Sequence, residues 1–348
     1  MEKENVASVY AGKRILVTGA SGFIGSFIVE EALRRGMQVW AAVRKSSSRQ
    51  YLQDERIRFF ELNLSSESEL KEQLKDVRFD YVVHAAGVTK CLHKEDFHRI
   101  NTEGTIHLVK ALAAVKMPVK KFVYLSSLSI FGAIHEEQPY EEIKETDHPQ
   151  PNTAYGKSKL EAEAFLDKWA TEVGNGSFPY VVLRPTGVYG PREKDYFLMA
   201  KSIKGHTDFS VGYKRQDITF VYVTDVVQAV FLALEKGGSG RKYFLSDGEV
   251  YQSATFSDLI IREMGHPWCL RIKAPIWILR IATFFGELIG KATGSVSALN
   301  NDKYHILRQR NWRCDIEPAR RELGYEPLVK LDKGVKLTVE WYKEQGWL

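Results

Sequence analysis

The sequence predicts an α/β protein with a doubly wound parallel sheet and a smaller C-terminal region. Three observations support this prediction. Short apolar runs alternate with helical patterns from residue 14 onward, and the first of these runs ends in a glycine-rich turn. The chain has 348 residues, of which 44% are hydrophobic, so it can bury one large core and a smaller companion.

The first half of the chain alternates expected strands with expected helices. We expect strands at 15–20, 38–43, 57–62, 81–87 and 122–128, and helices at 23–35, 67–75 and 100–115. The strands are nearly uninterrupted apolar runs, which is typical of parallel strands that helices cover on both faces. Two further strands are expected at 180–190 and 219–224, the second followed by a helix from Asp225.

Charge and cysteine content argue against several classes of protein. The 49 basic and 44 acidic residues give a net charge of +5 and are mixed along the chain, so no nucleic acid is expected as a partner. Cys91, Cys269 and Cys314 follow no metal-binding spacing, so we expect neither a disulfide framework nor a metal site. Charged residues stand where a signal peptide needs an apolar run, so a cytoplasmic location is expected.

The segment 274–291 is the most apolar helical candidate. No apolar run reaches the length of a transmembrane segment. Arg280, Glu287 and Lys291 recur at helical spacing and would share one face. We therefore interpret the segment as an amphipathic helix that lines a pocket or packs on a partner. Contact with a membrane surface is the alternative, which is weakened because basic residues do not dominate the polar face.

The segment VTGASGFIGS places Gly19, Gly22 and Gly25 directly after the first strand and at the start of a helix. In that context one glycine permits a tight turn, the next lets a pyrophosphate approach the backbone, and the third lets helix and strand pack closely. Backbone amides at the start of the helix would bind the anion. The turn therefore predicts a Rossmann-type dinucleotide site.

The spacing of these glycines resembles that of the extended short-chain dehydrogenase/reductase (SDR) superfamily, the NAD-dependent epimerase/dehydratase family. The resemblance continues through HAAG, Asn101 with Gly104, LSSLSIFG, YGKSK, LRPTGVYGPR, VYVTDVV and ARRELGYEP. The wording of these motifs is closest to sterol or 3-beta-hydroxysteroid dehydrogenase-like and dihydroflavonol reductase-like members. The strand–helix alternation becomes irregular after residue 187. We therefore expect a Rossmann NAD(P)-binding domain over 1–186, rejoined by the strand and helix at 217–236, and a substrate-binding region over 187–216 and 245–348.

The end of the second strand bears on the choice of cofactor. An NAD-preferring member would usually carry an acid there for the ribose hydroxyls, but this chain has Val43, followed by Arg44 and Lys45. A guanidinium can bind a 2′-phosphate bidentately, so we predict NADP(H), with NAD(H) possible. Asn63 stands where the family often has an Asp near the adenine. The resemblance also implies cofactor contacts at Ser21, Phe23, Ile24, Leu64, His84, Ala85, Ala86, Gly87, Pro185, Thr186 and Val188.

Tyr155 and Lys159 are the predicted acid–base pair. They are four residues apart in a segment of helical composition, so both side chains leave one face of a helix. A free tyrosine has a pKa of about 10, which a neighbouring ammonium and a cationic nicotinamide would lower. The resemblance implies that Tyr155 exchanges a proton with the substrate, that Lys159 also binds the nicotinamide ribose, and that Ser127 hydrogen-bonds the substrate oxygen.

Two positions bear on the substrate. Sugar-nucleotide relatives usually place Asn where this chain has Gly187 and tend to carry Arg where it has Ile218, although Arg192, Lys214 or Arg215 could compensate. We therefore expect interconversion of a secondary hydroxyl and a ketone on an apolar, steroid-like or flavonol-like small molecule. The alternatives are a nucleotide-sugar epimerase or reductase with transient hydride transfer, and a noncatalytic NADP-binding regulatory protein.

The resemblance also implies a homodimer. In relatives, two long helices that correspond to the segments around 106–115 and 159–169 often pair across a dimer axis as a four-helix bundle. The sequence itself contains no direct sign of this pairing.

Overall fold

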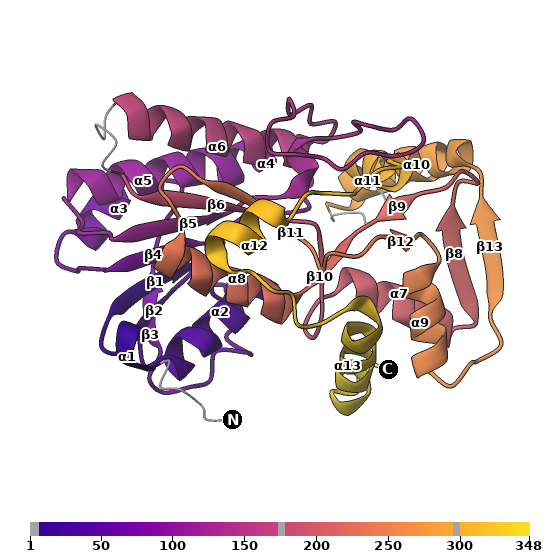
Figure 1. Cartoon of the computed structure of the whole chain (residues 1–348), viewed down its shortest axis with the longest axis horizontal. Coiled ribbons are helices and arrows are strands. Elements are labelled where there is room, and N and C mark those ends of the chain that lie inside the picture. Colours follow the sequence, from indigo (N-terminus) through magenta and orange to yellow (C-terminus); the bar gives the residue numbers. More distant parts are fainter. Residues whose placement is uncertain (1–6, 173–177, 295–299) are drawn as a thin grey trace.

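The computed structural model describes residues 7–172, 178–294 and 300–348, which form a seven-stranded parallel sheet with helices on both faces and a smaller second lobe (Figure 1). The strand order is β11-β6-β5-β4-β1-β2-β3. The order reverses between β1 and β4, and in doubly wound sheets ligands bind in the crevice at this point. The strands are β1 (Arg14–Thr18), β2 (Gln38–Val43), β3 (Arg58–Glu61), β4 (Tyr81–His84), β5 (Lys121–Leu125), β6 (Tyr180–Pro185) and β11 (Lys242–Leu245).

Successive side chains of the central strands enter two separate cores. On β1, Ile15 and Val17 point into one core and Leu16 into the other, as the period of two in a strand requires. The first core packs against α1 (Ala7–Tyr10), α2 (Phe23–Arg34), α8 (Val223–Lys236) and α12 (Glu317–Leu323). The second packs against α3 (Glu67–Leu74), α5 (Gly104–Ala114) and α6 (Ala154–Glu172). The predicted α/β fold is therefore confirmed, with strands that are apolar on both faces.

The second lobe contains three two-stranded sheets and several helices, and its own core includes Tyr189, Phe220 and Phe256. The sheets pair β7 (Gly187–Tyr189) with β10 (Phe220–Tyr222), β8 (Thr207–Val211) with β13 (Leu270–Ala274), and β9 (Asp217–Ile218) with β12 (Tyr251–Gln252). The helices are α7 (Asp195–Lys204), α9 (Thr255–Glu263), α10 (Ile276–Thr293), α11 (Asn301–Arg308) and α13 (Leu331–Glu344). The short helix α4 (Glu95–Phe97) runs through a π-helical turn, His98–Glu103, into α5.

The structure differs from the expected division at two places. The strand expected at 219–224 does not rejoin the large sheet: β10 pairs with β7, and the seventh strand is β11 instead. Helix α8 does pack on the large sheet. Within 245–348, α12 and Tyr325 also return to the first core. Hydrophobicity marks each of these segments as buried, but it does not specify which sheet buries it, because both cores are apolar.

Helices α5 and α6 lie on the same face of the sheet (Figure 1), and the homodimer remains a prediction. In the described part of the chain, no helix combines the length and the apolarity that crossing a membrane requires.

Candidate active site

The three predicted catalytic side chains line one cavity of about 450 Å³ at the carboxyl ends of the parallel strands. Ser127 follows β5, and its Oγ accepts a hydrogen bond from the Ser129 amide at 3.1 Å, which caps a short 3-10 turn. Tyr155 lies in the first turn of α6, and Lys159 lies one turn further along. The ends of β5 and the start of α6 therefore bring the three residues together.

The glycine turn lines the same cavity, and its packing requires glycine. A Cβ on Gly25 would lie 2.1 Å from the carbonyl oxygen of Gly19, and Gly19 has φ +69° and would place a Cβ 2.7 Å from the Ala85 backbone. The first turn of α2 opens into the cavity through Gly22. A helix N-terminus at a glycine-rich turn fits the pyrophosphate of a dinucleotide.

Lys159 is almost fully buried beneath the cavity. Its Nζ donates a hydrogen bond to the Leu125 carbonyl oxygen at 2.8 Å and lies 4.8 Å from the centre of the Tyr124 ring. Burial lowers the pKa of Lys159 to about 8, and the carboxylate of Glu163, one turn along α6, acts in the opposite direction. Glu163 is itself buried and accepts a hydrogen bond from Arg184 Nη2 at 2.6 Å. The Lys159 ammonium therefore has little contact with solvent, and the Glu163 carboxylate, which is itself paired with Arg184, provides only a weak counter-charge.

Tyr155 keeps its proton in the absence of other charges. Burial raises the pKa of Tyr155 to about 12, and a hydrogen bond with Ser127 acts against this rise. Its ring packs edge-on against Phe97, with the ring centroids 6.3 Å apart. A half-buried phenol that is paired with a serine hydroxyl and lies one turn from a lysine can donate a proton to a carbonyl oxygen and take it back from an alcohol.

Asp302, which the sequence analysis did not single out, holds the start of α6. Its two carboxylate oxygens accept hydrogen bonds from the amides of Ala154 and Tyr155, each at 3.1 Å. The first amides of a helix have no partner within the helix, and a negative charge there also interacts favourably with the helix dipole. Asp302 lies in α11, about 150 residues away in sequence, so no local pattern could have revealed the contact.

Besides Tyr155 and Lys159, the structure brings ten of the predicted cofactor residues to the cavity and leaves seven outside its lining. Those that line it are Gly19, Gly22, Phe23, Ile24, Gly25, Ala85, Gly87, Pro185, Thr186 and Val188. Those outside the lining are Ser21, Arg44, Lys45, Asn63, Leu64, His84 and Ala86. The predicted contacts of both groups with a cofactor remain predictions.

Two of the residues outside the lining already have protein partners. The ring nitrogens of buried His84 lie 2.7 Å from Thr18 Oγ1 and 3.0 Å from Thr105 Oγ1, and burial lowers the pKa of His84 to about 3. The Asn63 amide nitrogen donates to Glu69 at 2.7 Å. The side chain of His84 therefore braces the end of β4, and Asn63 ties the chain to α3. The side chain of Asn101 bonds both backbone groups of Val88: its Oδ1 accepts from the amide and its Nδ2 donates to the carbonyl oxygen.

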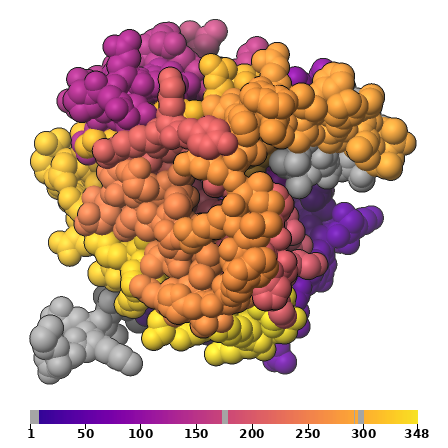
Figure 2. Space-filling view, turned by 90° about the vertical axis from the view of Figure 1, so that its right-hand side faces the viewer, coloured from indigo at the N-terminus to yellow at the C-terminus, as the bar shows by residue number. Residues whose placement is uncertain are grey.

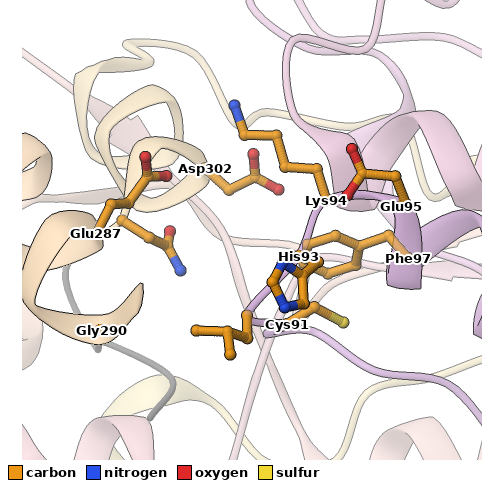
Figure 3. Close-up of a pocket in the computed structure, with 10 residues that line it drawn as sticks. Cys91, His93, Lys94, Glu95, Phe97, Glu287, Gly290 and Asp302 are labelled. Atoms are coloured by element: carbon orange, nitrogen blue, oxygen red, sulfur yellow. The ribbon is translucent and has the colours of Figure 1, made fainter. Parts of the chain in front are cut away.

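A second cavity of about 230 Å³ adjoins the first and shares Asn300 and Asp302 with it. Figure 3 shows that Lys94 and Glu95 approach from one side, whereas Glu287 and Asp302 lie on the other. Glu287 belongs to α10, which confirms that the apolar segment 274–291 is a helix that lines a pocket. The wall of this second cavity is strongly charged.

Comparison with known proteins identifies the family. The sequence model of the NAD dependent epimerase/dehydratase family matches residues 15–246. Curated relatives include the sterol-4-alpha-carboxylate 3-dehydrogenase of Candida albicans, which is 26% identical over 95% of this chain and 97% of its own. Another is the UDP-glucose 4-epimerase of Vibrio cholerae, which is 26% identical over 94% of this chain and 95% of its own.

A solved structure agrees with this assignment. The UDP-glucose 4-epimerase of Thermotoga maritima, determined with UDP-glucose, aligns with a TM-score of 0.76 and 26% identity, covering 95% of this chain and 99% of that one. The predicted fold class and the predicted resemblance are therefore both confirmed. Because the family's sequence model covers well over half of the chain and the glycine turn fits a dinucleotide, the chain belongs to the NAD dependent epimerase/dehydratase family and is an NAD(P)-dependent extended SDR enzyme.

Proposed function

We propose that this enzyme is an NADP(H)-dependent oxidoreductase that interconverts a secondary hydroxyl and a ketone on an apolar substrate. The observation that supports it best is the surroundings of Gly187, where sugar-nucleotide relatives usually carry Asn. A Cβ there would lie 2.7 Å from the Tyr196 hydroxyl oxygen and 3.3 Å from the Phe220 ring. Aromatic side chains thus fill the space that a diphosphate-binding amide would need.

Two of the three cations that could compensate already have protein partners. Arg192 donates to Ser26 at 2.9 Å and to Glu30 at 2.6 Å, and it stacks between two aromatic rings. Arg215 is paired with Asp217 at 2.7 Å. A diphosphate that enters the cavity loses its hydration, and without free cations it forms few hydrogen bonds or ion pairs that compensate for this loss. The protein contacts of Arg192 and Arg215 therefore favour a substrate without a diphosphate.

The end of β2 supports the preference for NADP(H). Val43 ends the strand, so the position that carries an acid in NAD-preferring relatives has no carboxylate here. Arg44 and Lys45 follow with exposed side chains, and across residues 7–172, 178–294 and 300–348 neither has an ion-pair partner. A guanidinium without a counter-ion can bind a phosphate bidentately.

The proposed reaction uses the three clustered side chains. The glycine turn and Lys159 would hold a nicotinamide cofactor in the cavity, and this cofactor would supply the hydride in reduction and accept it in oxidation. In reduction the Tyr155 hydroxyl gives its proton to the substrate oxygen, while Ser127 donates a hydrogen bond to the same oxygen. The Lys159 ammonium stabilises the phenolate that remains, and the proton returns to Tyr155 from solvent or, in oxidation, from the alcohol.

A nucleotide-sugar epimerase is the second candidate, and the charged walls of the cavities favour it. Lys90, Asp195 and Lys303 line the first cavity, and Lys94 and Glu287 line the second. Such groups can hydrogen-bond sugar hydroxyls. However, Lys90 and Lys303 both pair with Asp195, so part of this charge is neutralised within the protein.

A substrate panel separates the two candidates. Purified enzyme is incubated with NADPH or NADH and with sterol-like ketones, dihydroflavonols, and UDP- and dTDP-sugars. We expect stoichiometric oxidation of NADPH by an apolar ketone, with weaker use of NADH. Isomerisation of a sugar without net change in the cofactor would refute the redox proposal and establish the epimerase. Tight cofactor binding without turnover of any compound would favour the noncatalytic alternative.

A further inference from the structure

The solvent-facing side of helix α10 is apolar along its whole length. Its large exposed side chains are Trp277, Ile278, Ile281, Phe284, Phe285, Leu288 and Ile289, each with an exposed fraction between 41% and 65%. At 3.6 residues per turn these positions form one continuous arc of the helix. We call this arc the outer face of α10.

The side chains on the protein-facing side of α10 are smaller and more polar than those on the outer face. Leu279, Thr283 and Gly290 are buried against the rest of the lobe. Glu287, at one edge of the outer face, points to the second cavity and accepts a hydrogen bond from the Asn301 amide at 2.9 Å. A helix that only covered a core would bury its large apolar residues and expose its polar ones. Helix α10 exposes its large apolar residues instead, which is typical of a helix whose outer side contacts another apolar medium.

The apolar surface continues onto the neighbouring strand. Strand β13 leads through Pro275 directly into α10, and its Leu270 and Ile272 are 53% and 37% exposed. Phe209 of β8 is the register partner of Ile272 and is 62% exposed. Figure 2 faces this end of the molecule and shows the orange residues of α9, β13 and α10 over much of it, with those of α10 at the upper right. Large exposed apolar side chains that gather on one helix face and on the strands leading to it are typical of an interaction site.

Cations and aromatic rings border the outer face at its N-terminal end. Lys273 lies 5.5 Å from the centre of the Tyr213 ring, and the Tyr213 hydroxyl, on a side chain 66% exposed, donates to the Lys273 carbonyl oxygen at 3.0 Å. Arg280 lies over Tyr304, and Lys214 is exposed beside Tyr213. Among the residues that the structure describes, Lys214, Lys273 and Arg280 form no ion pair. These three cations, in a chain of net charge +5, lack negative partners.

We infer that the outer face of α10 lies in the interfacial layer of an anionic lipid bilayer, with Lys214, Lys273 and Arg280 at the level of the headgroups. The helix has 18 residues and lies in the membrane plane rather than crossing it. Aromatic side chains beside cations are typical of that layer. A second copy of the chain fits less well, because a twofold interface would bring identical cations together without a counter-charge.

This docking would bring the cavities close to the lipid. Glu287 and Gly290 of α10 line the second cavity, which shares Asn300 and Asp302 with the first. A membrane-dissolved compound would then reach the cleft without crossing water. The docking itself does not depend on the proposed reaction, and it is measured separately from activity.

Co-sedimentation with vesicles tests the inference. The full chain is mixed with large unilamellar vesicles of phosphatidylcholine alone, or with about one third phosphatidylglycerol. We expect binding to the anionic vesicles and weaker binding to the neutral ones. The double variant Phe284→Ser/Leu288→Ser should reduce the partition coefficient at least tenfold. Leu328→Ser is the matched control, because Leu328 is equally exposed at 67% but lies outside this surface, and it should bind like the unaltered chain.

A charge variant tests the rim separately. Lys273→Gln/Arg280→Gln should weaken binding to the anionic vesicles by about fivefold per cation and leave binding to neutral vesicles unchanged. All of the altered side chains are exposed, so circular dichroism and the thermal midpoint should not change. The inference fails if the chain sediments with neither kind of vesicle, or if the double variant binds as well as the control. It also fails if light scattering shows a lipid-free dimer that the double variant abolishes.

Discussion

Lys159→Met should make the protein more stable at neutral pH while removing its proposed activity. The unaltered protein keeps an ammonium group almost fully buried, with one hydrogen bond to a backbone carbonyl and, within the described part of the chain, no carboxylate in direct contact. Met has a similar length and no charge, so it can fill the same space without the desolvation penalty. The proposed proton transfer needs the Lys159 ammonium in this buried site, although burying that charge lowers the stability of the fold.

The expected magnitude follows from the pKa of Lys159. Burial lowers this pKa from 10.5 to about 8, and each pKa unit corresponds to 1.36 kcal/mol, so charging Lys159 costs the folded state about 3 kcal/mol below pH 8. Because the unfolded chain holds this proton more tightly, the penalty fades as the pH rises from 8 towards 10.5. Loss of the bond to the Leu125 carbonyl offsets about 1 kcal/mol. The variant should therefore gain about 2 kcal/mol at pH 7.

Urea unfolding of both proteins at pH 7 and pH 10 provides the assay. Other titrating groups are common to the two proteins, so they cancel in the difference between the two free energies of unfolding. From pH 7 to pH 10, the free energy of unfolding of the unaltered protein should rise by about 2 to 3 kcal/mol relative to that of the variant. A difference that is the same at both pH values would refute the reasoning, because Lys159 would then titrate alike in the folded and unfolded states.

Four other substitutions have defined outcomes. Tyr155→Phe should lower kcat by about 10² to 10⁴ without changing the Kd of NADPH, and near-normal turnover would remove Tyr155 from the mechanism. Gly25→Ala places a Cβ 2.1 Å from a backbone oxygen, so calorimetry should show weaker cofactor binding and a loss of about 1 to 3 kcal/mol in stability, and unchanged binding would contradict the cradle geometry. Asp302→Ala leaves two amides of α6 without their charged acceptor. We therefore expect the free energy of unfolding to fall by about 2 kcal/mol and kcat to fall while the Kd of the cofactor stays constant. A change in the Kd alone would argue against a positioning role. Arg44→Ser should weaken NADPH roughly tenfold and leave NADH unaffected, and equal losses for both cofactors would exclude a contact with the 2′-phosphate.

The tertiary structure changed the interpretation of several residues. The strand expected at 219–224 pairs with β7, and α12 returns to the first core. Asp302 reaches the start of α6 from a distant helix. The sequence left a pocket, a partner and a membrane surface open for the apolar side of α10, because a hydrophobic pattern alone does not tell whether protein or another medium covers an apolar arc. The structure shows that most of this apolar arc is exposed.

Local chemistry by itself determined the alternating strands and helices up to residue 128, the glycine turn, and the common helix face of Tyr155 and Lys159. Each of these features depends on neighbours a few residues apart, through backbone periodicity or the steric freedom of glycine. The pKa of Lys159, the carboxylate that holds α6 and the surroundings of Gly187 depend on residues far apart in the chain. Only the folded structure decided them, because burial and charge act through space and not along the sequence.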